Sequence, residues 1–345
     1  MPASGASTAW LVPAAFAVSA IVTWFAIGYA RRRRLVDEPG RRRSHAAPTP
    51  RGGGIGIVVA LLGCIGVPVL VVSGEHWAIP SAFALVALIG WIDDHRPLSA
   101  RLRLSVHAAA AILVFASAMH AHGVRLDGGV VLAALVVAFV LVAAINLHNF
   151  MDGIDGLLAV QAIYVSGVCS ALSAWHGDVS LAWLALVVAA AVLGFLPFNF
   201  PRARIFMGDV GSGSLGFAIG LLGLAVAAQG VVVGACVSIA CSGFVVDAGA
   251  TLASRMLRGR RWYSAHREHL YQWLVRGGSS HARVVGIYLA WNLVVATPVI
   301  LFVVVSRAGP ATALVLAGVV HALGLGAWVT GKRRCLRIAA NRSPD

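Results

Sequence analysis

The sequence predicts an all-α polytopic membrane protein, and two observations lead to this fold class. The chain of 345 residues is 59% hydrophobic and only 12% charged, whereas a soluble domain is typically about 25% charged. Its charged residues stand in short clusters between long apolar segments, many of which reach the roughly 18 residues that a membrane helix requires. A soluble core of this composition would leave too little polar surface to face water, which excludes a soluble protein.

Each apolar segment predicts one transmembrane helix, and we expect about eleven of them in a single domain over residues 1–345. No basic residue precedes the first segment and four Arg, Arg31–Arg34, follow it, the reverse of a secretory signal peptide, so we expect this helix to be retained. No internal repeat or low-complexity linker divides the chain. The expected helices lie roughly at 8–30, 54–72, 77–92, 105–121, 129–145, 157–174, 180–197, 213–228, 231–253, 284–305 and 311–330.

Basic residues collect on one side of the membrane in this arrangement. Of the 27 Lys and Arg, 25 fall in alternate connections and the C-terminal tail, and only Arg125 and Arg307 fall on the other side. By the positive-inside rule the N-terminus is then periplasmic and the C-terminus cytoplasmic. The net charge of +14 therefore reports topology, with some attraction for anionic lipid and phosphate, and nucleic-acid binding is not expected. The cytoplasmic loops are 31–53, 93–104, 146–156, 198–212 and 254–283.

Carboxylates gather at the cytoplasmic ends of the apolar segments. A carboxylate costs about 2.5–3.5 kcal/mol near the bilayer centre and less toward the interface, and several on one face repel one another. A divalent cation would relieve both penalties, because Mg²⁺ prefers carboxylate, water and phosphate oxygens. The residues concerned are Asp93, Asp94, Asp152, Asp155 and Asp209.

The segment NLHNFMDGIDG carries four polar side chains at intervals of three residues. On a helix this spacing places them near one face, and the glycines between them would let a ligand approach the backbone closely. Capping of the next helix is the alternative, but one Asp would be enough for that, so a binding site is favoured. The four are Asn146, Asn149, Asp152 and Asp155.

Two further segments place acids and bases at helix ends. In GWIDDHRPLSARLRLSVH the adjacent Asp93 and Asp94 suit either a metal site or a solvated cap, and Arg101 and Arg103 could hold phosphate. In FNFPRARIFMGDVGSGSLG, Asp209 precedes a membrane helix. The glycines there match G-x-G-x-x-G without the strand that a dinucleotide fold requires, although a helix N-terminus can still cradle an anion.

The first and last long loops add cationic candidates. Arg51 stands beside a glycine run, and His45 lies upstream of it. In YSAHREHLYQWLVRGG, His266 and His269 can face one way on a short helix. No nearby Cys completes a zinc site, so phosphate or nucleotide contacts are preferred, and loop histidines without a role stay open. All five polar segments share the cytoplasmic side, which predicts one composite site for an anionic ligand and a metal.

These segments, in this order over roughly 37–276, resemble the polyprenyl-phosphate N-acetylhexosamine-1-phosphate transferase superfamily, nearest its O-antigen-initiating branch. The resemblance implies transfer of a sugar-1-phosphate from a UDP-N-acetylhexosamine to undecaprenyl phosphate, release of UMP, and a requirement for Mg²⁺, with Mn²⁺ as an alternative. It places the enzyme in the bacterial inner membrane, with the active site toward the cytoplasm. It implies a role in starting O-antigen or related cell-envelope polysaccharide synthesis.

The resemblance also assigns roles to individual residues, and it likens Asp247 to an acidic residue common in that span. The catalytic group would be Asp93, Asp94, Asp155 and His266. The metal would be held by Asp209, Asp155 and Asn149. The substrates would contact His45, Arg51, Arg101, Arg103, Asn146, Asn149, Asp152, Asn199, Arg267 and His269.

Two departures bear on the substrate. His266–His269 read HREH where the peptidoglycan translocase carries a run of histidines, and His107 stands where the O-antigen branch often has Gln. Both favour a simple UDP-N-acetylhexosamine over the muramyl-pentapeptide donor. The muramyl-pentapeptide transferase stays open as an alternative, as does a transporter with a cytoplasmic cation site, although a transporter would place its polar residues near mid-bilayer. The sugar, a homodimer and the number of chemical steps also stay open.

Overall fold

The computed structural model is a bundle of helices, and it describes residues 9–37, 48–66, 77–121, 123, 127–260 and 266–341. Within these residues nine helices are long and apolar enough to cross a membrane, which confirms a polytopic α-helical membrane protein. They are α2 (Leu11–Arg32), α6 (Ala100–Ala121), α7 (Gly128–Met151), α8 (Leu157–Trp175), α9 (Val179–Asn199), α10 (Asp209–Ala227), α11 (Val231–Leu257), the segment His281–Val305, and α15 (Pro310–Asn341).

The two remaining expected spans also contain helix. The segment expected at 54–72 begins as α3 (Ile55–Leu61) and continues as the π-helix η1 (Leu62–Gly66). The segment expected at 77–92 is α5 (Ala78–His95). Each of the eleven apolar segments therefore holds a helix, and the described part of the 54–72 segment, α3 with η1, covers residues 55–66.

The segment His281–Val305 is interrupted where polar side chains meet inside the bundle. It consists of α13 (His281–Ala290), the π-helix η2 (Trp291–Ala296) and α14 (Thr297–Val305). Asn292 in η2 donates from Nδ2 to Oε1 of Gln161 on α8 at 2.7 Å. Inside a membrane such buried polar groups need each other, because no water is there to satisfy them.

Helix α10 forms the centre of the bundle because its glycines allow neighbouring helices to approach closely. A Cβ at Gly216 would lie 2.7 Å from the Ala144 carbonyl oxygen of α7. By contrast, α2, α7 and α15 lie outside and expose many apolar side chains, as expected for surfaces that face lipid.

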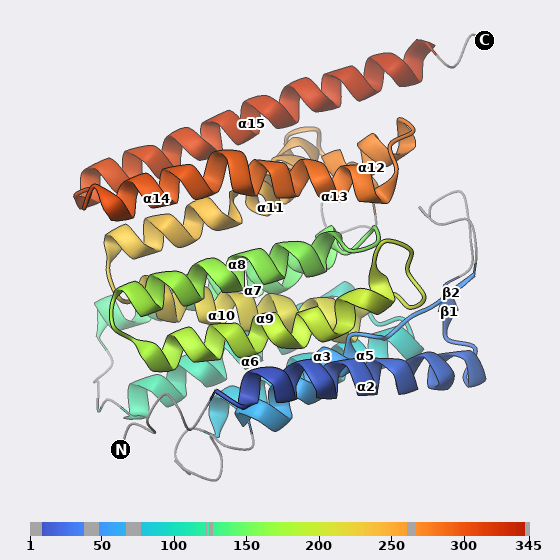
Figure 1. Ribbon diagram of the computed structural model, residues 1–345, viewed down its shortest axis with the longest axis horizontal. Coiled ribbons are helices and arrows are strands. Elements are labelled where there is room, and N and C mark those ends of the chain that lie inside the picture. Colours follow the sequence, from blue (N-terminus) through green and yellow to red (C-terminus); the bar gives the residue numbers. More distant parts are fainter. Residues whose placement is uncertain are drawn as a thin grey trace.

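The helices run side by side along one axis, and the chain crosses the bundle back and forth (Figure 1). Helices α2 and α15 run in the same direction, so their C-terminal ends lie at the same end of the bundle, at the right in Figure 1. That end also carries the short antiparallel pair β1 (Val36–Asp37) and β2 (Thr49–Pro50), and the short helix α12 (Leu270–Arg276). The sequence patterns did not predict the strand pair. The assignment of this end to the cytoplasm stays a prediction.

Candidate active site

An Arg between two carboxylates marks the centre of the polar end. Arg103, near the start of α6, donates from Nη1 to Oδ2 of Asp93 at 2.8 Å and to Oδ2 of Asp209 at 2.7 Å. Asp93 stands at the end of α5 and Asp209 begins α10. Asp93 and Asp209, 116 positions apart in the chain, therefore share the guanidinium group of Arg103, whereas the sequence patterns predicted Arg103 as a ligand for phosphate.

Asn149 joins this group from the last turn of α7. Its Nδ2 atom donates to Oδ1 of Asp209 at 2.9 Å and to Oγ of Ser212 at 3.0 Å. Because the amide nitrogen points toward Asp209, the side chain of Asn149 orients that carboxylate. We call Asp93, Arg103, Asn149 and Asp209 the acid cluster.

Asp94 has a different position from its neighbour Asp93. It is only 3% exposed, and its two carboxylate oxygens accept the backbone N–H groups of Asp209 and Val210, each at 3.0 Å. These are among the N–H groups that an α-helix leaves without an internal partner at its start. Asp94 therefore caps α10 from another helix and sets where Asp209 lies.

Glycines permit this close approach of backbones. A Cβ at Gly90 of α5 would overlap the carbonyl group of Asp209, and a Cβ at Gly54 would overlap Gly211 of α10. The loop that contains Gly52–Gly54 is also held in place, because the backbone N–H of Gly53 donates to the carbonyl of Phe206 at 2.9 Å. Arg51 donates from Nη2 to the carbonyl of Asp94, so it braces the cap from the first loop.

Asp152 lies where α7 ends. The chain leaves the helix there, with φ −89° and ψ 50°. Burial, together with the negative charges of three neighbouring carboxylates, raises the pKa of Asp152 to about 8. Its side chain accepts no hydrogen bond from the residues that the structure describes. A carboxylate in this position is stabilised by a bound cation or by protonation.

The expectation that all four polar residues of NLHNFMDGIDG share one helix face is wrong. Helix α7 ends at Met151, and Asp152 to Gly156 form a turn before α8. Asn146 donates from Nδ2 to the carbonyl of Val142 on its own helix at 2.7 Å. Because the helix ends before Asp152, the three-residue spacing does not align the four side chains, and Asn149 is the member of this set that bonds to Asp209 directly.

Asp155 and Asn199 brace the loop between α9 and α10. Oδ2 of Asp155 lies 3.2 Å from Nδ1 of His281, at the start of α13, and accepts the backbone N–H of Ala203 at 3.1 Å. Asn199 is buried, accepts the N–H of Gly156 at 2.8 Å and donates to the carbonyl of Ile205 at 3.1 Å. The sequence patterns did not indicate His281. The one local feature that points to this position is the Ser-Ser pair before it, which is typical of a helix start.

The last loop brings its histidines against the end of α7. The ring of Phe150 lies 5.9 Å from that of His266 and 6.0 Å from that of His269 between centroids. The two histidine rings are 4.9 Å apart. The backbone carbonyl of Arg267 accepts a hydrogen bond from Nη2 of Arg276 at 2.8 Å, which fixes this part of the loop to α12. These residues therefore border the turn that carries Asp152, as predicted from their shared side.

Two predicted substrate ligands, Arg101 and His45, have no described contact with the acid cluster. Arg101 is exposed on the surface of α6, and His45 lies outside the described residues. The ligand roles of both stay predictions.

The donor atoms at this end fit a hard divalent cation. Asp209, Asp93, Asn149 and Asp152 supply carboxylate and amide oxygens, the ligand type that Mg²⁺ takes together with waters and phosphate oxygens. Across the described ranges, no group of three or more His, Cys, Asp and Glu is arranged to hold a metal by itself. Arg103 instead supplies the positive charge between two of the carboxylates. A cation here would need oxygens from a substrate as well as from the protein.

Comparison with known proteins identifies the family. The model of glycosyl transferase family 4 matches residues 76–227, which include the acid cluster. The decaprenyl-phosphate N-acetylglucosaminephosphotransferase of Mycolicibacterium smegmatis is 32% identical over 81% of this chain and 79% of its own length.

Two other bacterial relatives carry names from both branches. The undecaprenyl-phosphate alpha-N-acetylglucosaminyl 1-phosphate transferase of Escherichia coli O157:H7 is 28% identical over 76% of this chain and 75% of its own length. The phospho-N-acetylmuramoyl-pentapeptide-transferase of Moorella thermoacetica is 34% identical over 53% of this chain and 63% of its own length. This chain is a multi-pass bacterial membrane protein, and it belongs to glycosyl transferase family 4, the superfamily of polyprenyl-phosphate N-acetylhexosamine-1-phosphate transferases.

Proposed function

We propose that the protein transfers an N-acetylhexosamine-1-phosphate from a UDP-sugar to undecaprenyl phosphate and releases UMP. The observation that carries the proposal is the acid cluster, with Arg103 between Asp93 and Asp209 at one end of an apolar bundle. A lipid phosphate can reach such a site from the bilayer and a nucleotide from water. The names of the relatives supply the reaction class.

The reaction forms one P–O bond and breaks another. A phosphate oxygen of the lipid attacks the phosphorus that carries the sugar, and the bond from that phosphorus to the UMP oxygen breaks. UMP leaves with the bonding electron pair, and the lipid keeps the sugar on a diphosphate. Because phosphoryl transfer depends on positioning and charge neutralisation, Arg103 is suited to hold a phosphate once substrate displaces it from a carboxylate.

The carboxylates divide the remaining work. Asp209 and Asn149, with the nearby Asp152, would hold Mg²⁺, which supplies charge neutralisation for the diphosphate. Asp93 would orient Arg103 and accept the proton of a singly protonated lipid phosphate. Asp94 would keep Asp209 in place through the cap on α10. The family resemblance implies catalysis and metal binding for Asp155, but its contacts with His281 and Ala203 suit the support of the α9–α10 loop better.

The last loop would contact the donor. His266, Arg267 and His269 lie beside the turn that carries Asp152, which places cationic and hydrogen-bonding groups next to the proposed diphosphate position. The donor we propose is a simple UDP-N-acetylhexosamine. We place the enzyme in the bacterial inner membrane, with its active site facing the cytoplasm. The product would start O-antigen or a related cell-envelope polysaccharide. The Moorella relative makes UDP-MurNAc-pentapeptide the second donor to test.

The test is UMP release by the purified protein with undecaprenyl phosphate and a panel of UDP-sugars that includes UDP-MurNAc-pentapeptide. We expect turnover that stops with a chelator and returns with added Mg²⁺. Asp209→Asn is expected to lower turnover by about 100-fold or more. Asp178→Asn is the matched control, because Asp178 caps α9 in an exposed turn through Leu181. Absence of UMP release with every donor, or wild-type turnover by Asp209→Asn, would refute the proposal.

A further inference from the structure

Helix α12 is too short to hold its own position. It has seven residues, and an isolated helix of this length is not stable in water. Yet residues His266–His269, which we call the histidine loop, lead directly into its N-terminus, because His269 is its N-cap residue. The position of the loop therefore depends on what anchors α12.

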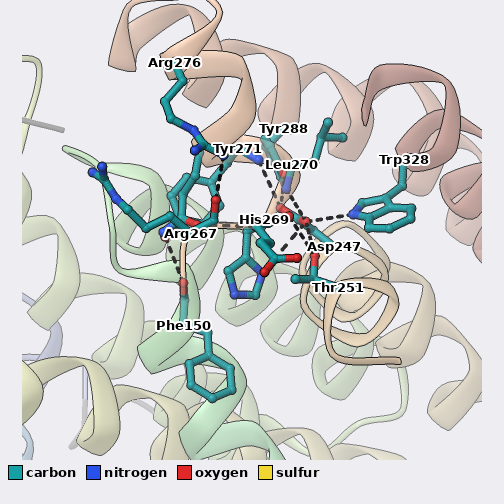
Figure 2. Close-up of polar contacts among 12 residues, drawn as sticks. Phe150, Asp247, Thr251, Arg267, His269, Leu270, Tyr271, Arg276, Tyr288 and Trp328 are labelled. Carbon is teal, nitrogen blue, oxygen red and sulfur yellow. Dashed lines mark hydrogen bonds and ion pairs between the residues drawn. The ribbon is translucent and has the colours of Figure 1, made fainter. Parts of the chain in front are cut away.

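The anchor is a carboxylate inside a membrane helix. Asp247 of α11 is 2% exposed. Its Oδ1 atom accepts the N–H of Leu270 at 2.7 Å, and Oδ2 accepts the N–H of Tyr271 at 3.2 Å. These are the first two N–H groups of α12, which lack partners within the helix, and a negative charge at a helix N-terminus is favourable. Figure 2 shows these bonds converging on Asp247.

The same carboxylate is held by two more helices. Tyr288 of α13 donates its hydroxyl to Oδ2 at 2.6 Å, and Trp328 of α15 donates Nε1–H to Oδ1 at 3.1 Å (Figure 2). Four helices thus meet at one side chain. Both oxygens of Asp247 are taken up by donors, so this carboxylate is not available to hold a metal or a substrate.

The anchor reaches the histidine loop through Tyr271 and His269. The Tyr271 hydroxyl donates to the carbonyl of Phe150 at 2.9 Å, and it lies so close to Gly153 that a Cβ there would overlap it. The His269 ring stacks on that of Tyr271 at 5.8 Å and on that of Phe150 at 6.0 Å between centroids. Nδ1 of His269 lies 4.0 Å from Oδ1 of Asp247.

We propose that Asp247 is a positioning residue for the reaction. Its carboxylate docks α12 onto the end of α7, and this docking holds His269, with His266 and Arg267, beside the Asp152 turn. The inference rests on the proposed function, because it assigns these three residues to the donor site. Asp247 itself touches no substrate.

Asp247→Asn tests the anchor by changing few atoms. The amide keeps one acceptor oxygen and turns an NH₂ group toward two donors, so α12 should loosen. Hydrogen exchange of the peptide that covers α12 is expected to speed up, while peptides from α8 and α10 keep the wild-type rate. Tyr288→Phe removes one donor and leaves the carboxylate, so it should give a smaller change in the same peptide. Ser242→Ala is the matched control. Ser242 lies on α11 like Asp247, but its hydroxyl accepts a hydrogen bond from Trp291 and not from α12.

Kinetics distinguish positioning from general destabilisation. We expect Asp247→Asn to lower kcat by about 10- to 100-fold, as a displaced catalytic group does, with an unchanged Mg²⁺ requirement because the acid cluster is untouched. If Asp247 acts through His269 and its neighbours, Asp247→Asn should lower kcat by a smaller factor in His269→Gln than in the wild-type protein, since residues that act as a unit are not additive.

Two outcomes would overturn the inference. One is wild-type exchange of the α12 peptide in Asp247→Asn, and the other is a full independent loss of kcat in the double variant. If the wild-type protein released no UMP with any donor, the proposed function would fail instead. The exchange experiment would then still report whether Asp247 anchors α12.

Discussion

Asp94→Asn changes one oxygen of a buried carboxylate that caps a helix from outside. In the wild-type protein both oxygens of Asp94 accept a backbone N–H, from Asp209 and Val210, each at 3.0 Å. The asparagine amide retains one acceptor and presents its NH₂ group to the other N–H. One charge-assisted hydrogen bond is lost, and a buried backbone donor is left without a partner.

The magnitude follows from two opposing effects. Loss of a hydrogen bond to a charged group costs about 1.5–3 kcal/mol, and loss of the negative charge at the start of α10 adds about 0.3–1 kcal/mol. Removing the charge also relieves repulsion from Asp152, which lies within electrostatic reach of Asp94, and offsets part of this cost. We therefore expect a net loss of about 2 kcal/mol, a decrease of about 4 °C in the melting temperature at about 2 °C per kcal/mol.

Thermal unfolding in detergent measures this loss, with UMP release measured in parallel. Asp178→Asn is the control, since Asp178 caps α9 through Leu181 in an exposed turn, where Asn is as good a cap as Asp, and its melting temperature should not change. Turnover of Asp94→Asn should fall because Asp209 moves with the start of α10. If Asp94→Asn lost turnover while its melting temperature stayed that of the wild-type protein, the cap argument would be refuted and Asp94 would take part in the chemistry itself.

Three further predictions follow from the packing, the titration and the topology. Gly90→Ala should lower turnover at least tenfold, because its Cβ would overlap the carbonyl of Asp209, whereas Gly249→Ala, with no atom within 4 Å of its Cβ, should be neutral; equal activities would contradict this. Burial lowers the pKa of His269 to about 4 from its ordinary value of 6.5, so the unfolded chain binds a proton that the folded protein excludes. The contribution to stability is then complete above pH 6.5 and is lost as the pH falls to 4, by at most about 3 kcal/mol; unfolding of His269→Gln should depend less on pH in this window, and an identical pH dependence would argue against a neutral buried ring. A reporter after Arg307 should lie in the periplasm and one between α11 and α12 in the cytoplasm; the reverse result would invert the topology.

The composition and the spacing of the apolar segments determined the helical architecture of this protein. Eleven apolar segments lie in the sequence and each holds a helix, because a long apolar segment in lipid satisfies its backbone hydrogen bonds within itself only as a helix. The carboxylates that the bilayer penalises also marked the site in advance. Asp93, Asn149 and Asp209 were singled out from residue type and from their place at segment ends, and they do meet through hydrogen bonds and Arg103.

Only the tertiary structure decided what each polar group does at that site. Asp93 and Asp94 are neighbours in the chain, yet one shares Arg103 with Asp209 and the other caps α10. Likewise, nothing near Asp247 in the sequence indicates that it holds α12 in place. Sequence spacing describes contacts along one helix, whereas these roles depend on which backbones approach across the bundle. Glycines such as Gly54 and Gly211 permit that approach, and their presence in the sequence does not show which helix comes close to them.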